Sequence, residues 1–344
     1  MNDAYAQAGV NRDTENETKA GMAGALETSD QRVLNKIGAF ATLYDGSFTE
    51  YKHPVLVLKT EEPGTKQLIA LRNDSVETIC EDLVNHLVND CIVMGARPLS
   101  IQDCIVAGKV EKPIVLRMVK AFAHAAKDNG CTLTGGETSW QPGTIPDGTY
   151  ILTASIVGVV EKEKIIDGSN IQEGDVVLAL ASNGIHTNGF SLVRKIMEAS
   201  PKLLQESVGG KPFLESILTP HRAYYMALKD LFPQSGLTGL AHITGGGIKE
   251  NLNRILPTGL NARIDLSKIR ILPIFATLKK FGNLEDTDML RTFNMGVGMT
   301  AVVRREFTEE AIAHLKAGGV EAYEIGLISK GSGEVAFAGE LQWS

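Results

Sequence analysis

The sequence comprises 344 residues, which is long for a single hydrophobic core, so two domains are expected. Hydrophobic residues make up 43% and charged residues 22%, the proportions of an ordinary globular protein. The net charge of −7 excludes a general attraction for polyanions, so we expect no nucleic-acid partner, and an anionic substrate must be held by local groups.

The N-terminal segment is polar and irregular. Residues 1–17 lack the apolar stretch of a secretory signal, and no run in the chain reaches the ~18–20 apolar residues of a membrane-spanning helix. No C-x-x-C spacing occurs among the four cysteines, Cys80, Cys91, Cys104 and Cys131. These are expected to be reduced thiols. The sequence therefore predicts a cytoplasmic protein that contacts no membrane.

Strand and helix patterns are mixed along the rest of the chain. Strands are expected at 55–60, 101–106, 150–160, 175–181, 297–303 and 322–328. Helices are expected at 81–94, 113–129, 190–197, 219–231, 248–256 and 308–318. The mixture predicts an α/β or α+β fold. The polar segment 162–174 follows the longest strand, so we place the boundary there and expect domains at 1–168 and 169–344.

The expected helix 81–94 combines an apolar face with acidic residues. The apolar face is formed by Val84, Leu87, Val88 and Cys91. Asp82 and Asp90 lie two turns apart and can point the same way. Burying a carboxylate without a partner is costly, so Asp90 needs one. Mg²⁺ would serve, and a salt bridge or a helix cap is the alternative.

Two segments of the N-terminal half are typical of ligand-binding loops. Residues 59–66 follow a strand and end in Gly-Thr-Lys, which offers backbone N–H groups, a hydroxyl and an ammonium to a polyphosphate. The P-loop motif is absent, and a polar turn with a solvated lysine is the alternative. Gly135 and Gly136 would let the backbone approach a ligand closely, and a tight hairpin turn explains them equally well.

Three segments of the C-terminal half carry further signals. Residues 182–189 join a strand to a helix whose free amides favour an anion, and His186 within them is expected to be functional. Residues 242–247 place His242 ahead of three glycines, which are hard to explain by packing alone and favour phosphate binding by amides. Residues 291–299 offer an arginine and an asparagine beside glycines, a weak signal by itself.

In order, these segments resemble the aminoimidazole ribonucleotide synthetases, or phosphoribosylformylglycinamidine cyclo-ligases, over nearly the whole chain. The resemblance begins at Tyr5-Ala6-Gln7-Ala8-Gly9-Val10 and includes GGET at 135–138, GVVEK at 158–162 and IIDGS at 165–169. Its most specific stretches are HTNGFSLVR at 186–194, AHITGGG at 241–247 and RTFNMGVGM at 291–299. Motifs of this length and order exclude chance similarity.

The resemblance implies a two-domain ATP-using synthetase fold. It implies a homodimer whose N-terminal sheets pair into a barrel, and a C-terminal mixed sheet with helices. It also implies ATP and Mg²⁺ as cofactors and formylglycinamidine ribonucleotide as substrate. The γ-phosphoryl group of ATP would activate the formyl amide oxygen, so that the amidine nitrogen closes the imidazole ring and phosphate leaves. The protein would supply positioning and charge neutralisation.

The segments and the resemblance together assign four roles. Catalysis is assigned to His186, Asn188 and His242. ATP binding is assigned to Glu61, Gly64, Thr65, Lys66 and Asp74. Metal binding is assigned to Glu61, Asp90 and Glu137. Substrate binding is assigned to Gly135, Gly136, Glu137, Thr187, Gly189, Gly245, Gly246, Gly247 and Arg291.

The N-terminal half departs from the family pattern. The family usually reads Thr-Asp-Gly-Val-Gly-Thr-Lys where this chain has Glu61-Glu62-Pro63 after Thr60. The family's Tyr-Lys-Asp start is here Tyr5-Ala6-Gln7, which lacks the cation. These changes leave two alternatives open. One is another ATP-using enzyme of the superfamily, similar to selenophosphate synthetases, thiamine-phosphate kinases or hydrogenase-maturation enzymes, although the chain lacks a cysteine before Cys80. The other is a binding protein that has lost ATP chemistry.

Overall fold

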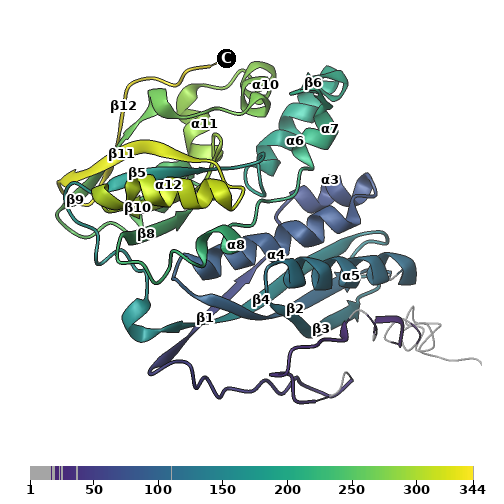
Figure 1. Cartoon of the computed structure of the whole chain (residues 1–344). Helices are drawn as coiled ribbons and strands as arrows, with labels where there is room; N and C mark the ends of the chain where they lie inside the picture. Colours follow the sequence, from purple (N-terminus) through teal and green to yellow (C-terminus); the bar gives the residue numbers. More distant parts are fainter. Residues whose placement is uncertain are drawn as a thin grey trace, which may run out of the picture.

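The chain folds into two sheets that are each backed by helices (Figure 1). The computed structural model describes residues 17, 20–22, 24, 26–35, 38–109 and 111–343. The stretch around Gln7, where the family resemblance begins, lies outside the described residues. The fold is mixed α/β, as expected. None of the helices in the described ranges combines the length and the apolar composition of a membrane span.

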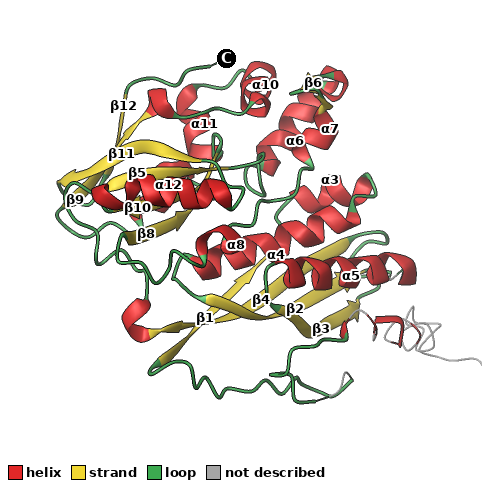
Figure 2. Ribbon diagram, in the orientation of Figure 1, coloured by secondary structure: helices red, strands yellow, loops and turns green. Residues whose placement is uncertain are grey.

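The first sheet has the strand order β1-β4-β2-β3. Its strands are β1 (Pro54–Glu61), β2 (Arg97–Ala107), β3 (Thr132–Trp140) and β4 (Tyr150–Glu161). Its helices are α3 (Lys66–Arg72), α4 (Val76–Ile92) and α5 (Lys112–Asp128). β4 is antiparallel to β1 and β2, whereas β2 and β3 are parallel. Helices α4 and α5 lie over one face of this sheet (Figure 2).

Helix α4 forms the core of this half. It begins earlier than expected, at Val76, and its predicted apolar face is confirmed. Val84, Leu87, Val88 and Cys91 are all fully buried. Complete burial of one such aliphatic side chain contributes roughly 1.5–3 kcal/mol, so this face ties the helix firmly to the sheet.

The opposite face of the first sheet carries exposed apolar side chains. Along β1, side chains alternate between partly buried and exposed, and Leu56 and Leu58 are 53% and 71% exposed. Leu58 lies opposite Val157 of β4, and Ile151 of the same strand is 40% exposed. A sheet face of this kind is unusual on a monomer surface.

The second sheet has the strand order β12-β9-β11-β5-β10-β8. Its strands are β5 (Val176–Ala181), β8 (Leu237–His242), β9 (Leu260–Asp265), β10 (Val297–Val303), β11 (Ala322–Lys330) and β12 (Val335–Ala338). A small ribbon pairs β6 (Ser207–Val208) with β7 (Lys211–Pro212). β10 matches its predicted bounds, and all of its residues are buried between β5 and β8.

Helices and short turns complete the second half. The α-helices are α6 (Phe190–Ala199), α7 (Phe213–Ile217), α8 (Tyr225–Leu228), α9 (Gly247–Asn253), α10 (Pro273–Gly282), α11 (Asp286–Thr292) and α12 (Thr308–Ala317). The 3-10 turns are η1 (Lys162–Lys164), η2 (Pro201–Gln205), η3 (Leu266–Lys268) and η4 (Arg305–Phe307). η1 begins the segment that joins the two sheets.

The expected helix 219–231 is wrong over most of its length. Only Tyr225–Leu228 is helical, because the backbone of residues 221, 222 and 224 hydrogen-bonds to side chains of α4. The hairpin alternative for Gly135 and Gly136 is also wrong. Both glycines lie inside β3, where a Cβ at position 136 would collide with the backbone and carboxylate of Asp103 on β2.

Candidate active site

Polar side chains of α4 meet the loop before α8 at the junction of the two halves. Asn85 Nδ2 donates to the carbonyl of His221 at 2.7 Å, and Asn89 Nδ2 donates to the carbonyl of Arg222 at 2.8 Å. Asn89 Oδ1 accepts from the backbone N–H of Tyr224. These hydrogen bonds, buried or partly buried, join side chains of one half to backbone of the other, so they fix the relative position of the two halves.

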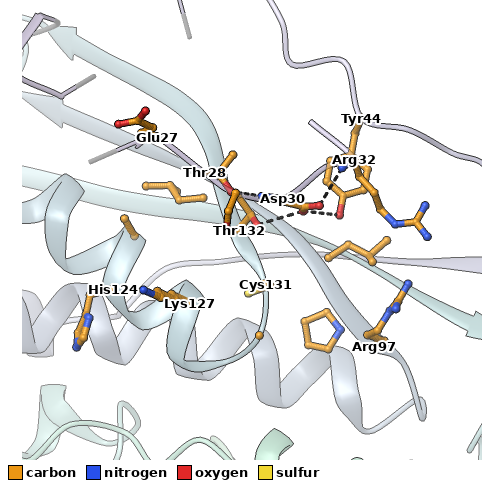
Figure 3. Close-up of a pocket in the computed structure, with 16 residues that line it drawn as sticks. Glu27, Thr28, Asp30, Arg32, Tyr44, Arg97, His124, Lys127, Cys131 and Thr132 are labelled. Carbon is orange, nitrogen blue, oxygen red and sulfur yellow. Dashed lines mark hydrogen bonds between the residues drawn. The ribbon is translucent and has the colours of Figure 1, made fainter. Parts of the chain in front are cut away.

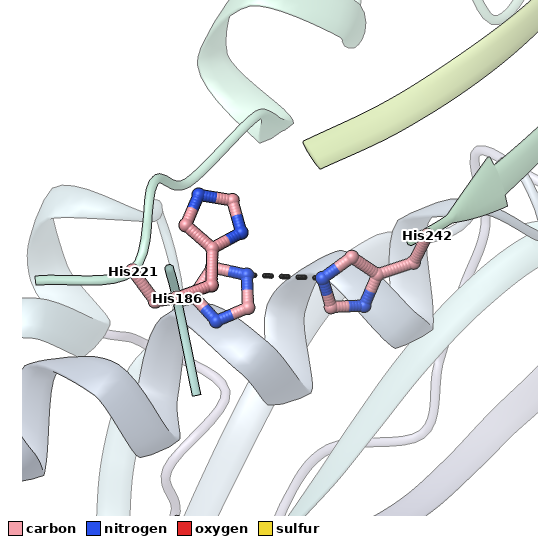
Figure 4. Close-up of side chains that lie close together, drawn as sticks. All are labelled: His186, His221 and His242. Atoms are coloured by element: carbon pink, nitrogen blue, oxygen red, sulfur yellow. Dashed lines mark hydrogen bonds between the residues drawn. The ribbon is translucent and has the colours of Figure 1, made fainter. Parts of the chain in front are cut away.

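Four buried imidazoles gather at this junction: His86, His186, His221 and His242. They come from α4, from the turn after β5, from the loop before α8 and from the end of β8. His221 contacts two of the others, since its ring stacks on His186 and its Nε2 lies 3.0 Å from Nε2 of His242 (Figure 4). The sequence predicts two members of this cluster, His186 and His242.

A chain of hydrogen bonds fixes the orientation of His242. Its Nδ1 lies 2.7 Å from Asp90 Oδ1, and a carboxylate only accepts, so Nδ1 carries the hydrogen. Thr187 Oγ1 bridges His221 Nδ1 at 3.3 Å and His86 Nδ1 at 3.0 Å. Both nitrogens of His242 are therefore engaged within the protein.

The electrostatics of the cluster follow from burial. Burial, and then repulsion from His242, lowers the pKa of His86 to about 4, although Asp90 opposes the shift. Burial and neighbouring imidazoles also hold the pKa of His186 and of His221 well below the usual value. These imidazoles are therefore neutral at neutral pH and can each donate from one nitrogen and accept at the other.

Two sets of groups in the described ranges have the spacing of metal ligands. They are His186 with His221 and His242, and His86 with Asp90 and His242. The first set suits a metal poorly, because the rings of His186 and His221 lie 3.9 Å apart at 20°. Nitrogen lone pairs lie in the ring plane, so two stacked imidazoles do not converge on one ion. In the second set, Asp90 is already paired with His242 and Lys59.

The predicted nucleotide loop reaches the same junction. Gly64 has a φ of 64° and lies against the carbonyl of Thr187, and Thr65 Oγ1 lies 3.3 Å from the hydroxyl of Ser191. Lys66 is fully buried, with Nζ 2.7 Å from Asp82 Oδ2. The ammonium predicted to bind ATP is therefore held inside the protein.

The predicted acids separate into different places. Glu61 and Asp90 are joined through Lys59, at 2.6 Å and 3.2 Å. Asp74 is exposed at the end of α3 and pairs with Arg117. Glu137 lies on β3, at the opposite edge of the sheet from Glu61.

Within this subunit, Glu61 and Glu137 lie too far apart to bind the same metal ion. This differs from the expectation that both bind the metal. Glu61 pairs with Ala154, Ala154 with Asp103, and Asp103 with Gly136, so three strand spacings separate β1 from β3. At ~4.8 Å each these amount to about 14 Å, far beyond a shared coordination sphere. The acid that neighbours Glu137 is Asp103 instead.

Asp103 should make stability depend on pH. Burial, reinforced by the charge of Glu137, raises its pKa to about 7. Between about pH 4 and 7 the folded state then holds a proton that the unfolded state has lost, so stability falls as pH rises through this window. Asp103→Asn is expected to raise the melting temperature above pH 7 in buffer with EDTA, with the gain vanishing near pH 4.

The matched control is Asp147→Asn, at an exposed turn position. This variant should melt like the wild type at every pH, because the substitution changes no buried contact. A melting temperature of Asp103→Asn that parallels the wild type from pH 4 to 8 would contradict the argument.

One of the three predicted glycines, Gly246, lines a cavity with Arg291. Gly246, Lys249 and Arg291 are among the residues around a volume of about 610 Å³. Local backbone geometry and packing account for two of the three glycines, which were expected to be hard to explain by packing alone. Gly246 and Gly247 both have positive φ, and a Cβ at 247 would collide with the carbonyl of Leu290. Gly245, the third glycine, lies against the side chain of Asn188.

A second cavity, of about 530 Å³, lies between the N-terminal arm and the first sheet. Asp30 occupies its wall and accepts hydrogen bonds from Tyr44 and Thr132, at 3.0 Å and 3.2 Å (Figure 3). Arg32 and Arg97 also line it and share Glu50. None of the residues assigned from the sequence lines this cavity.

Sequence reasoning missed His86, His221, Asn183 and Asp103 as members of the site. His221 and Asp103 lie in segments expected to be a helix and a strand, where a polar side chain gives no signal of its own. Their partners are distant in sequence, since His221 N–H donates to Asp82 across 139 positions. Asn183 stands next to the motif at 186–189 and was recognisable as part of the same turn.

Two family descriptions match the chain. AIR synthase related protein, N-terminal domain, matches residues 47–160, and AIR synthase related protein, C-terminal domain, matches residues 172–339. The two matches fall on the first and the second sheet respectively, so together they span most of the chain.

Curated relatives are similar over the same range. The chain is 43% identical over 304 residues to a phosphoribosylformylglycinamidine cyclo-ligase of Burkholderia ambifaria, covering 88% of this chain and 86% of the relative. It is 39% identical over 345 residues to a protein of the same name from Bacillus cytotoxicus, covering 99% of both. The similarity therefore extends across both halves.

Solved structures share the fold at low identity. HypE of E. coli superposes with a TM-score of 0.69 at 16% identity, covering 94% of both chains. Hydrogenase maturation protein HypE in complex with ATP superposes with a TM-score of 0.63 at 17% identity, covering 88% of this chain and 85% of the other. At these identities the likeness concerns the fold alone.

Proposed function

The chain belongs to the AIR synthase family, and from this premise we propose that it is an ATP-dependent phosphoribosylformylglycinamidine cyclo-ligase of purine synthesis. The observation that carries the proposal is the 39–43% identity to relatives of that one activity across both halves of the chain. The reaction converts formylglycinamidine ribonucleotide and ATP into aminoimidazole ribonucleotide, ADP and phosphate.

The chemistry needs an activated oxygen and a nitrogen that loses a proton. An amide oxygen is a poor leaving group until it is phosphorylated by the γ-phosphoryl group of ATP. The amidine nitrogen then attacks the activated carbon, the ring closes and phosphate departs. The protein positions the partners and neutralises charge, which account for most catalysis in such transfers. His186, Asn188 and His242 are proposed as the catalytic group around this step.

The sites for the nucleotide, the metal ion and the substrate are each proposed on a separate observation. A nucleotide is proposed beside the first sheet, where Gly64 and Thr65 lie against the turn at 187–191. The complex of HypE, a neighbour in fold, with ATP supports the use of this nucleotide. Mg²⁺ is proposed beside Asp103 and Glu137, because these two carboxylates are neighbours on the paired strands β2 and β3 and carboxylate oxygens suit this ion. Bound there, Mg²⁺ would offset phosphate charge. Arg291 and Gly246 are proposed for the substrate, because both line one cavity.

The proposal is tested by assaying the purified protein with formylglycinamidine ribonucleotide and ATP, and following the aminoimidazole product. We expect turnover that requires both substrates. Thermal shifts with ATP and Mg²⁺ separate the alternatives. A binding protein without ATP chemistry would show neither turnover nor a shift with ATP, whereas another enzyme of the superfamily would respond to ATP but form no aminoimidazole.

A homodimer through the first sheet is proposed from its apolar outer face. Leu58→Asp is expected to convert a dimer into a monomer at micromolar concentration, because a buried carboxylate at the centre of the interface lacks a partner. Sedimentation velocity measures the change. Lys112→Asp, which places the same charge at the start of α5, is the control and should remain dimeric. A monomeric wild type would overturn the barrel arrangement.

Two further proposals concern organisation. We place the domain boundary at residue 168, within the link between β4 and β5, with support from the two family matches on either side of it. We also propose a cytoplasmic location, which the family's place in purine synthesis favours.

A further inference from the structure

Two polar atoms on the turn between β5 and α6 are buried without a hydrogen-bond partner in the described part of the chain. They are Nδ1 of His186 and Nδ2 of Asn188. Each such atom costs about 1–3 kcal/mol, so natural proteins keep few of them. His186 Nδ1 is a ring nitrogen and Asn188 Nδ2 is a hydrogen-bond donor, and the two residues lie two positions apart on the same turn. A ligand that offers a donor and an acceptor would satisfy both.

The side chain of Asn183 decides which nitrogen of His186 carries the hydrogen. Asn183 Nδ2 donates to the carbonyl of Pro220 at 2.9 Å, which turns its Oδ1 toward His186. That oxygen lies 3.1 Å from His186 Nε2. An amide oxygen only accepts, so Nε2 is protonated and the lone pair of the neutral ring lies on Nδ1.

The ring of His186 is also held in its plane. It stacks on His221 with 3.9 Å between ring centroids. On the backbone of β10, a Cβ at Gly298 would collide with Cε1 of His186, so the ring depends on a glycine there. His186 adopts a φ of 66°, which costs a non-glycine residue about 1–3 kcal/mol. The stacked ring of His221 and the close approach of Gly298 thus hold the imidazole of His186 in place, on a strained backbone. Its Nδ1 has no hydrogen-bond partner in the described structure.

We propose that Asn183 is a positioning residue that holds His186 as the Nε2–H tautomer, so that Nδ1 accepts the proton of the attacking amidine nitrogen. As the new C–N bond forms, this proton moves to Nδ1 and the resulting imidazolium keeps its Nε2–H bond to Asn183. Asn188 Nδ2 donates to the oxygen that departs with phosphate. This inference rests on the proposed function, which supplies the identity of the substrate.

The first test is the tautomer itself, which is independent of activity. In protein labelled with ¹⁵N-histidine, the wild-type His186 is expected to show a protonated Nε2 and an unprotonated Nδ1. Asn183→Ala should yield a mixture of tautomers and lower kcat about tenfold or more, with KM little changed. General acid–base groups contribute roughly 10²–10⁴-fold, so partial loss falls within this range. Asn183→Asp keeps the acceptor and should restore the Nε2–H form and most of kcat.

Asn35→Ala is the matched control, because Asn35 also donates one hydrogen bond and accepts one. It should alter neither the His186 tautomer nor kcat. A protonated Nδ1 in wild-type His186 overturns the proposal, as does a loss of kcat in Asn183→Ala with an unchanged tautomer. If Asn183→Ala does not fold, the wild-type spectrum and Asn183→Asp still decide. The expected tautomers without cyclo-ligase turnover would instead refute the proposed function.

Discussion

Lys66→Ala is expected to lower the free energy of unfolding by about 3–5 kcal/mol. The Lys66 ammonium donates to Asp82 Oδ1 and to the carbonyl of Thr219, both at 2.9 Å, and neither charged side chain of the pair is exposed. Removing the lysine leaves the Asp82 carboxylate buried without its counterion. Urea unfolding, followed by circular dichroism, measures the change.

Two further variants separate this loss from other effects. Lys66→Ala combined with Asp82→Asn should regain part of the stability, because the amide oxygen still accepts from His221 N–H without a buried charge. Lys112→Ala removes an exposed pair with Glu17 and should change stability by less than about 1 kcal/mol. If Lys66→Ala unfolds like the wild type, the pair is not structural. A double variant with weakened ATP affinity would support the original assignment of Lys66 to ATP.

His186→Ala and Asn188→Ala are expected to lower kcat by roughly 10²–10⁴-fold, the contribution of a positioned acid–base group. His186 is 1% exposed and presents an unpaired Nδ1. Asn188→Ala should melt close to the wild type, because Asn188 Nδ2 makes no hydrogen bond in the described structure. His186→Ala also removes a buried ring and its bond to Asn183, so its melting temperature should fall, but the folded protein should still lack turnover. Steady-state kinetics and thermal melting on the same preparations measure both quantities.

His124→Ala is the control for the histidine change, because His124 is exposed on α5 and pairs with the exposed Asp128. It should keep wild-type turnover. If His186→Ala and Asn188→Ala keep full turnover, or lose it only because they unfold, then the turn is scaffolding and the chemistry lies elsewhere.

Elements defined by local apolar pattern were predictable from the sequence. β10 occurs at its predicted bounds because a strand buried on both faces is a continuous apolar run. The buried face of α4 follows from helical spacing alone. The helix expected from Thr219-Pro220 fails for a long-range reason. Its backbone groups bond to Asp82, Asn85 and Asn89, and no local signal reports partners so far away.

The candidate site was predictable where a motif forms a single turn. The turn at 186–189 and the end of β8 at His242 do lie together. His221 joins them only through the packing of the two halves, so spacing along the chain does not reveal it. For the acidic residues, the sequence identifies the candidates but does not show which of them lie together. Carboxylates were recognisable one by one, but which of them are neighbours depends on strand order, and that order separates Glu61 from Glu137.

The junction between α4 and residues 219–224 has an evolutionary consequence. Asp82, Asn85 and Asn89 bind main-chain N–H and C=O groups that every non-proline residue possesses. These hydrogen bonds therefore do not depend on which side chains the loop carries. Replacing the imidazole at position 221 would leave them in place. A substitution at position 221 during evolution would therefore change the chemistry of the histidine cluster and keep the hydrogen bonds that join the two halves.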